Sequence, residues 1–133
     1  MKLVIDSNIL ISAYSVPGEA REAWQAGLAP HRLLISPEIF LEVERGLRQT
    51  QFDLSPAEIT VMLKDILKRC EVVRPKTPYQ GEMADENDRH LVSLAREVGA
   101  DALITGNRAR KNLETAAGIP ILSLAQFLTS LQG

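Results

Sequence analysis

The sequence predicts an α/β fold, a three-layer sandwich in which helices cover both faces of a mostly parallel central sheet of about five strands. Two observations support this prediction. Short apolar runs of strand length recur along the chain, and segments with helix start and stop signals separate them. Because parallel neighbours need crossover connections, which are usually helical and cover the sheet, this alternation favours a parallel sheet.

Five apolar runs are the expected strands. The first, Leu3-Val4-Ile5, stops at Asp6-Ser7-Asn8, which predicts a strand buried on both faces followed by a turn or a helix cap. The other four expected strands are residues 33–35, 72–73, 102–104 and 121–122. The short, uninterrupted apolar character of these runs is typical of strands inside a parallel sheet.

Helices are expected at residues 19–26, 37–48, 56–69, 88–98 and 123–131. Ser55 with Glu58 three residues later forms a capping-box pattern at the start of the third helix, and Ser123 with Gln126 repeats it at the last. Gly99 supplies a stop signal for the fourth helix. The resulting order alternates strands and helices throughout.

The composition indicates one domain spanning residues 1–133, because 133 residues with 45% hydrophobic and 24% charged side chains fit one ordinary core. The net charge of −2 gives no general attraction for nucleic acid, so a polyanion needs a local basic patch or metal. Cys70 is the only cysteine, and no apolar stretch approaches membrane-spanning length. We therefore expect a cytoplasmic protein without a membrane segment.

The residues that directly follow the expected strands are the first candidates for a site, since ligands of open parallel sheets bind beyond the carboxyl ends of the strands. Asp6 and Asn107 occupy such positions. Asp6 could instead be an ordinary helix cap or turn former. Thr105 is placed to hydrogen-bond an acidic neighbour or a metal-bound water, or it is a strand-end hydroxyl with a local partner.

Asp88 is in line with an apolar stripe on the fourth expected helix, formed by Leu91, Val92, Ala95 and Val98. A carboxylate that points inward from the edge of a core needs a cation, hydrogen-bond donors or a raised pKa. Helix capping is the alternative explanation, because a helix N-terminus favours an anion. Asp85 is a secondary candidate that reaches the same place if the helix begins early.

The second expected helix carries two acids beside its apolar stripe, Glu42 and Glu44, and spacing does not choose between them. Asp101 precedes its strand, so we expect it to be structural. Arg108 and Arg110 follow the same strand and could hold phosphates, or form a solvated face. His31 and His90 form no metal pair or nucleophile–base dyad in this pattern and are expected to be exposed.

Taken together, five segments resemble a PIN domain: Leu-Val-Ile-Asp-Ser-Asn at the start, Ser-Pro-Glu-Ile-Phe-Leu-Glu-Val-Glu at 36–44, Asp-Glu-Asn-Asp at 85–88, Ala-Asp-Ala-Leu-Ile-Thr-Gly-Asn at 100–107, and Gly-Ile-Pro-Ile-Leu-Ser at 118–123. The resemblance covers essentially the whole chain in the family's order. It is greatest to the VapC-like subgroup, the toxin components of toxin-antitoxin pairs.

This resemblance implies a metal-dependent endoribonuclease that hydrolyses RNA phosphodiester bonds with Mg²⁺ or Mn²⁺. Asp6, Glu42 and Asp88 match the family's metal-binding acids, which selects Glu42 over Glu44 by analogy. The full expected metal set also contains Asn107 and Asp85. The expected substrate contacts are Ser7, Asn8, Thr105, Arg108 and Arg110. Hard oxygen ligands that leave room for water and phosphate suit these ions.

The chain departs from the family at Asn107, where an acid usually follows Thr-Gly. The alternative function is therefore a catalytically weak or inactive PIN-like domain that binds RNA or a protein. A phosphoacceptor domain is disfavoured, because Arg74 and Pro75 follow the run at 72–73, where that function needs an aspartate. The resemblance also implies an antitoxin partner, and a homodimer is a further possibility.

Overall fold

The computed structural model describes residues 1–26, 28, 30–83, 85–106 and 113–132. Its strands are β1 (Lys2–Ile5), β2 (Arg32–Ile35), β3 (Cys70–Val72), β4 (Ala102–Ile104) and β5 (Ile121–Leu122). In the part of the chain described, they form one sheet in the order β3-β2-β1-β4-β5, and each neighbouring pair is parallel. The predicted parallel sheet of five strands is confirmed, with β1 at its centre.

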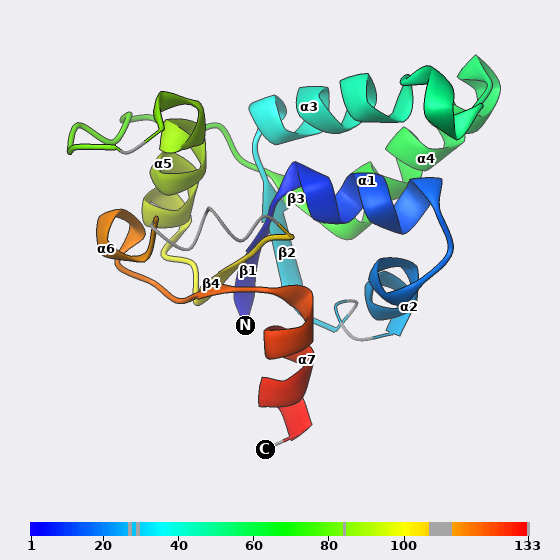
Figure 1. Ribbon diagram of the computed structural model, residues 1–133. Helices are drawn as coiled ribbons and strands as arrows, with labels where there is room; N and C mark the ends of the chain where they lie inside the picture. Colours follow the sequence, from blue (N-terminus) through cyan, green and yellow to red (C-terminus); the bar gives the residue numbers. More distant parts are fainter. Residues whose placement is uncertain (27, 29, 84, 107–112, 133) are drawn as a thin grey trace.

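The helices are α1 (Ser7–Ser15), α2 (Glu19–Ala26), α3 (Pro37–Leu47), α4 (Pro56–Arg69), α5 (Arg89–Val98), α6 (Glu114–Ala117) and α7 (Leu124–Gln132), with short 3₁₀ turns η1 (Thr50–Phe52) and η2 (Glu86–Asp88). In Figure 1, α5 and α6 lie on one side of the sheet and α1 and α2 on the other. Helix α3 begins at the carboxyl end of β2 and packs along α1. This is the predicted three-layer arrangement.

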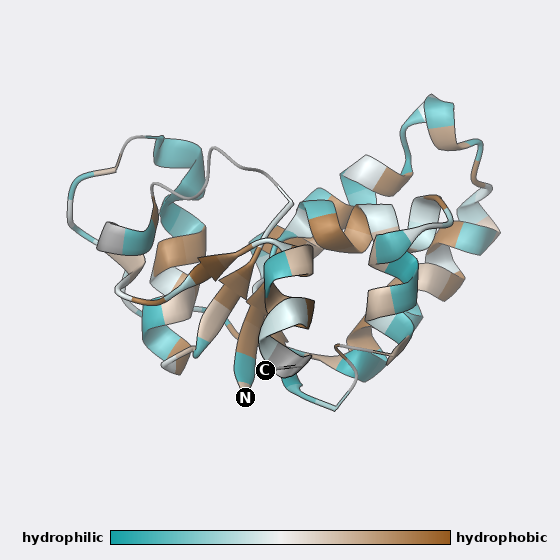
Figure 2. Cartoon of the chain, turned by 60° about the horizontal axis from the view of Figure 1, so that its bottom comes forward, coloured by the Kyte–Doolittle hydropathy of each residue, from teal (hydrophilic) through white to brown (hydrophobic). Residues whose placement is uncertain are grey.

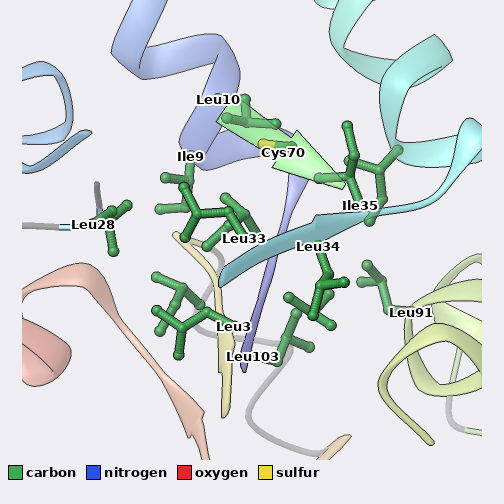
Figure 3. Close-up of a cluster of buried hydrophobic side chains, with 14 of the residues drawn as sticks. Leu3, Ile9, Leu10, Leu28, Leu33, Leu34, Ile35, Cys70, Leu91 and Leu103 are labelled. Atoms are coloured by element: carbon green, nitrogen blue, oxygen red, sulfur yellow. The ribbon is translucent and has the colours of Figure 1, made fainter. Parts of the chain in front are cut away.

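The core lies on both faces of the sheet. Leu33 of β2 points toward Ile9 and Leu10 of α1, whereas the next residue, Leu34, points toward Leu91 of α5 (Figure 3). All five side chains are buried. Figure 2 shows the strands as the most continuously hydrophobic part of the chain, with polar residues on the outer helix faces. Burial on both faces explains why the strand sequences are apolar runs without alternation.

Helix α1 differs from the sequence prediction, which placed only a turn or cap after Asp6. The segment contains three serines and two isoleucines in nine residues, and these residue types have modest helix propensity. Ile9, Leu10 and Ala13 are nevertheless buried. Tertiary packing therefore determines this helix, as is usual for short helices in proteins.

Strand β3 also differs, since it spans Cys70–Val72 rather than residues 72–73. The Val73 N–H still donates to the Ile35 carbonyl at 2.8 Å, so the ladder extends one residue further than the strand. Cys70 is buried, as expected for an apolar structural cysteine. Within the described residues, no helix is both long and apolar enough to cross a bilayer.

Candidate functional site

Asp6 lies at the carboxyl end of the central strand and is fully buried, with 0% of its surface exposed. Its backbone N–H donates to the Ile104 carbonyl at 3.0 Å, so the residue still belongs to the sheet ladder. Asp6 occupies the N-cap position of α1, yet its side chain makes no capping hydrogen bond. Asp6 is therefore the cap of α1 by position, but its carboxylate does not make the capping contact.

Two hydroxyl groups donate to the Asp6 carboxylate instead. Thr105 Oγ1 donates to Oδ2 at 2.8 Å and Ser7 Oγ donates to Oδ1 at 3.3 Å. The register explains the first contact, because β1 pairs Ile5 with Ile104 of β4 and the next residue of each strand is Asp6 and Thr105. Of the two expectations for Thr105, the hydrogen bond to an acidic neighbour is confirmed.

Asp88 is buried, with 9% of its surface exposed, at the N-terminal end of α5. It is the N-cap residue of α5, and its side chain makes no capping hydrogen bond either. The apolar stripe that predicted its inward position is largely confirmed, since Leu91, Val92 and Ala95 are buried. A buried carboxylate that does not cap its helix requires another stabilising interaction.

Asp85 takes the capping role that Asp88 lacks. Its Oδ1 accepts the Asn87 N–H at 2.9 Å at the start of η2, and the residue is exposed. The structure thus separates the two acids of the 85–88 motif: Asp88 is buried and Asp85 is a surface cap.

The structure also distinguishes Glu42 from Glu44, which spacing alone did not. Glu44 accepts from Arg48 of its own helix at 2.9 Å. Glu42 faces α5, and its Oε2 lies 3.5 Å from His90 Nε2. The acid that the family resemblance selected is therefore the one that points across to the helix of Asp88.

A cavity of about 600 Å³ lies between the beginnings of α3 and α5. Its polar lining includes Ser36, Glu38, Glu42, Arg74, Asn87 and His90. Ser36 directly follows β2 and caps α3, because its Oγ accepts the Ile39 N–H at 3.2 Å. Pro37, Pro75 and Pro78 add apolar wall to the same cavity. The cavity therefore opens at the carboxyl edge of the sheet.

Arg74 and His90 are lining residues that the sequence prediction did not place in a site. The signal for Arg74 was present, because it follows the run at 72–73 and so obeys the strand-end rule that identified Asp6. His90 carried no such signal. Its side chain is 12% exposed, so the expectation of an exposed histidine is wrong.

The loop of residues 74–83 is fixed to α5 by several hydrogen bonds. Arg89 donates to the carbonyls of Tyr79 and Gly81, and the Tyr79 N–H donates to Ser93 Oγ. Arg89 also pairs with Glu86 at 2.7 Å, and this pairing lowers the pKa of the Glu86 carboxyl. These hydrogen bonds hold the loop, which forms one wall of the cavity, against α5.

The remaining predicted site residues have different positions. Ser7 is buried and hydrogen-bonded to Asp6, whereas Asn8 is exposed on the first turn of α1. Asp101 accepts the Lys2 N–H at 2.8 Å at the opposite end of β4, which confirms its structural role. Asn107, Arg108 and Arg110 lie outside the described residues.

The donor set suits a hard divalent cation, because the donors are carboxylate oxygens. Two of the carboxylate side chains, Asp6 and Asp88, are buried. In the described ranges, no three His, Cys, Asp or Glu side chains lie close enough together to hold a metal ion as they stand. The donors fit Mg²⁺ or Mn²⁺ in kind, but the described side chains do not form a preassembled three-ligand centre.

The comparisons with known proteins agree with this architecture. A family model described as PIN domain matches residues 2–109. The structure of VapBC2 from Rickettsia felis bound to a promoter DNA fragment is similar with a TM-score of 0.67 and 18% identity, over 92% of this chain and 98% of that one. The structure of VapBC-1 from nontypeable Haemophilus influenzae is similar with a TM-score of 0.65 and 19% identity, over 94% of this chain and 99% of that one.

A PilT N-terminus domain protein from Sulfolobus solfataricus is similar with a TM-score of 0.56 and 16% identity, over 98% of this chain and 92% of that one. At these identities, the three structures support the fold alone. No curated protein sequence matches the chain significantly.

Proposed function

Because the chain belongs to the PIN-domain family, whose model matches residues 2–109, we propose that it is a divalent-metal-dependent endoribonuclease. One observation carries the proposal. Asp6 is a fully buried carboxylate at the carboxyl end of the central strand, it does not cap its helix, and Thr105 and Ser7 donate to it. Such an arrangement fixes the carboxylate oxygens for ligation.

The proposed ligands are Asp6, Glu42 and Asp88, with Asn107 and Asp85 as further contributors. Bound Mg²⁺ or Mn²⁺ supplies Lewis-acid activation of water and neutralises charge on the scissile phosphate. Thr105 orients Asp6 through its hydrogen bond. Three carboxylates that gathered around one point without a cation would repel one another, so in this proposal the bound cation completes the centre.

The substrate in this proposal is RNA, with a water oxygen replacing the leaving oxygen at phosphorus and a proton passing to the leaving oxygen. Arg74 is exposed, lines the same cavity as Glu42 and provides a positive charge for a phosphate. Ser7, Asn8, Thr105, Arg108 and Arg110 remain the predicted substrate contacts. The net charge of −2 makes such local contacts necessary.

The test is cleavage of labelled RNA by the full chain with Mn²⁺ or Mg²⁺. We expect cleavage that stops with a chelator and falls more than about 100-fold in Asp6→Asn, since a lost ligand costs more than a lost outer-shell partner. Asp101→Asn is the matched control and keeps the activity. Wild-type rates in Asp6→Asn contradict the mechanism. RNA binding by the wild type without cleavage supports the inactive PIN-like alternative.

We further propose that the chain is the toxin of a toxin-antitoxin pair and acts in the cytoplasm. Support comes from the fold shared with the two structures named VapBC and from exposed apolar side chains of α3 and α4, namely Leu41, Val61 and Leu67. Exposed apolar groups of this size are compatible with a partner surface.

Co-expression with the product of a small reading frame immediately upstream tests this proposal. We expect a stable complex by light scattering and loss of RNA cleavage within it. Light scattering of the isolated chain tests the homodimer. An upstream product that neither binds nor inhibits contradicts the pairing.

A further inference from the structure

His90 lies between two carboxylates of the opposite helix. Its Nε2 is 3.5 Å from Glu42 Oε2, and its Nδ1 is 3.9 Å from Glu38 Oε2. Glu38 and Glu42 are four residues apart and therefore occupy one face of α3. The imidazole belongs to the first turn of α5, directly after Arg89 and two residues after Asp88. Each ring nitrogen thus faces a different acid.

We propose that His90 is a positioning residue that fixes the Glu42 carboxylate in the orientation needed for metal binding. This inference rests on the proposed function, because it presumes that Glu42 is a ligand. A glutamate side chain has several rotatable bonds, and ordering it costs conformational entropy. Outer-shell partners that hold a ligating carboxylate remove this cost before the metal arrives.

The location of the contact favours positioning over simple surface pairing. His90 is 12% exposed and Glu42 34% exposed, whereas Glu38 is 68% exposed. Both His90 and Glu42 line the cavity of about 600 Å³, so their contact forms part of its wall. The N-terminal end of α5 therefore contributes its N-cap residue, Asp88, as a proposed ligand and His90 as the residue that orients a second ligand on α3.

The two ring nitrogens allow a sharp test, because each can be imitated by an amide. Gln at position 90 places its N–H₂ near the place of Nε2 and retains the contact with Glu42. Asn places its N–H₂ near the place of Nδ1 and retains only the contact with Glu38. Both variants keep a polar side chain of similar character, so thermal unfolding should differ little between them.

The measurement is Mn²⁺ affinity of the full chain by titration calorimetry. We expect His90→Asn to weaken Mn²⁺ binding by about 10- to 100-fold, and His90→Gln to stay within about threefold of wild type. His31→Asn is the matched control at the other histidine, whose ring contacts Phe127 and the N-terminal amine.

The outcomes separate this inference from the proposed function. Loss of Mn²⁺ binding in Asp6→Asn together with wild-type affinity in His90→Asn overturns the role of His90 and leaves the nuclease proposal standing. Equal losses in His90→Gln and His90→Asn also overturn it, because the contact with Glu42 then does not decide the affinity. A wild-type chain that binds no Mn²⁺ overturns both proposals.

Discussion

Thr105 Oγ1 donates a hydrogen bond to Asp6 Oδ2 at 2.8 Å, which joins the ends of the neighbouring strands β4 and β1. Both residues are buried. Parallel strands end at the same edge of a sheet, so residues 99 positions apart in sequence meet there. The contact fixes the carboxylate that the proposed mechanism places at the centre of the site.

Replacing Thr105 tests the value of this hydrogen bond. We expect Thr105→Val, which keeps the shape and removes the hydroxyl, to lower Mn²⁺ affinity and RNA cleavage by about 10-fold or more. Thr105→Ser retains the donor and should recover most of both. Calorimetry and a cleavage assay provide the measurement. Equal behaviour of the Val and Ser variants would contradict the orienting role.

Asn107 stands where the family usually has an acid. We expect Asn107→Asp to strengthen Mn²⁺ binding and to raise the cleavage rate, because a carboxylate adds a negative charge to the ligand set. Titration calorimetry measures the affinity and labelled RNA measures the rate. An unchanged Mn²⁺ affinity would count against a position for residue 107 in the site.

A polar network holds α4 to α1 and α2. Trp24 Nε1 donates to the Tyr14 hydroxyl at 2.8 Å, and this hydroxyl donates to Asp65 Oδ2 at 2.6 Å. We expect Tyr14→Phe to lower the free energy of unfolding by about 1–2 kcal/mol, since it removes both hydrogen bonds and takes away the acceptor of Trp24 Nε1, whereas Asp65 keeps its pairing with Arg69. Denaturant unfolding measures the change. Tyr79→Phe is the control, because Tyr79 hydrogen-bonds Arg89 and Ser93 through its backbone.

Cys70 predicts a dependence of stability on alkaline pH. Burial raises the pKa of its thiol from 9.0 to about 12. A raised folded-state pKa gives stability that is complete below pH 9 and is lost as pH rises from 9 toward 12, because only the unfolded chain releases the proton in that range. Between pH 8 and pH 10 the unfolding free energy should fall by about 1.4 kcal/mol from this group.

The control for this prediction is Cys70→Ala, which should show a shallower decline over the same interval. Burial also raises the pKa of Tyr14, with Asp65 adding to the effect, so a decline from that residue remains in the variant. Identical pH profiles for wild type and Cys70→Ala would contradict the account of Cys70.

Local sequence signals are sufficient to predict most of the helices and strands. The helices at 19–26 and 56–69 begin and end as predicted, because caps and apolar periodicity reside within the segment itself. Helix α1 was missed because its formation depends on Ile9, Leu10 and Ala13 packing in the core. Burial of this kind depends on chain segments distant in sequence, and periodicity within nine residues does not reveal it.

Part of the candidate site could be predicted from the rule that ligands of parallel sheets bind beyond the carboxyl ends of the strands. Asp6, Thr105 and Asp88 follow from the strand ends and one helical stripe, and all three are buried. His90 was not predictable, because its role arises from an approach of α5 to α3 that neither helix encodes alone. Likewise, spacing did not choose between Glu42 and Glu44, whereas their partners His90 and Arg48 distinguish them.

The central claim is that Asp6, Glu42 and Asp88 hold a divalent metal ion. Anomalous diffraction from crystals of the full chain grown with Mn²⁺ tests it most directly. The account predicts a manganese peak within ligating distance, about 2.0–2.3 Å, of carboxylate oxygens from these acids. A well-occupied manganese elsewhere, or none at saturating concentration, would contradict it.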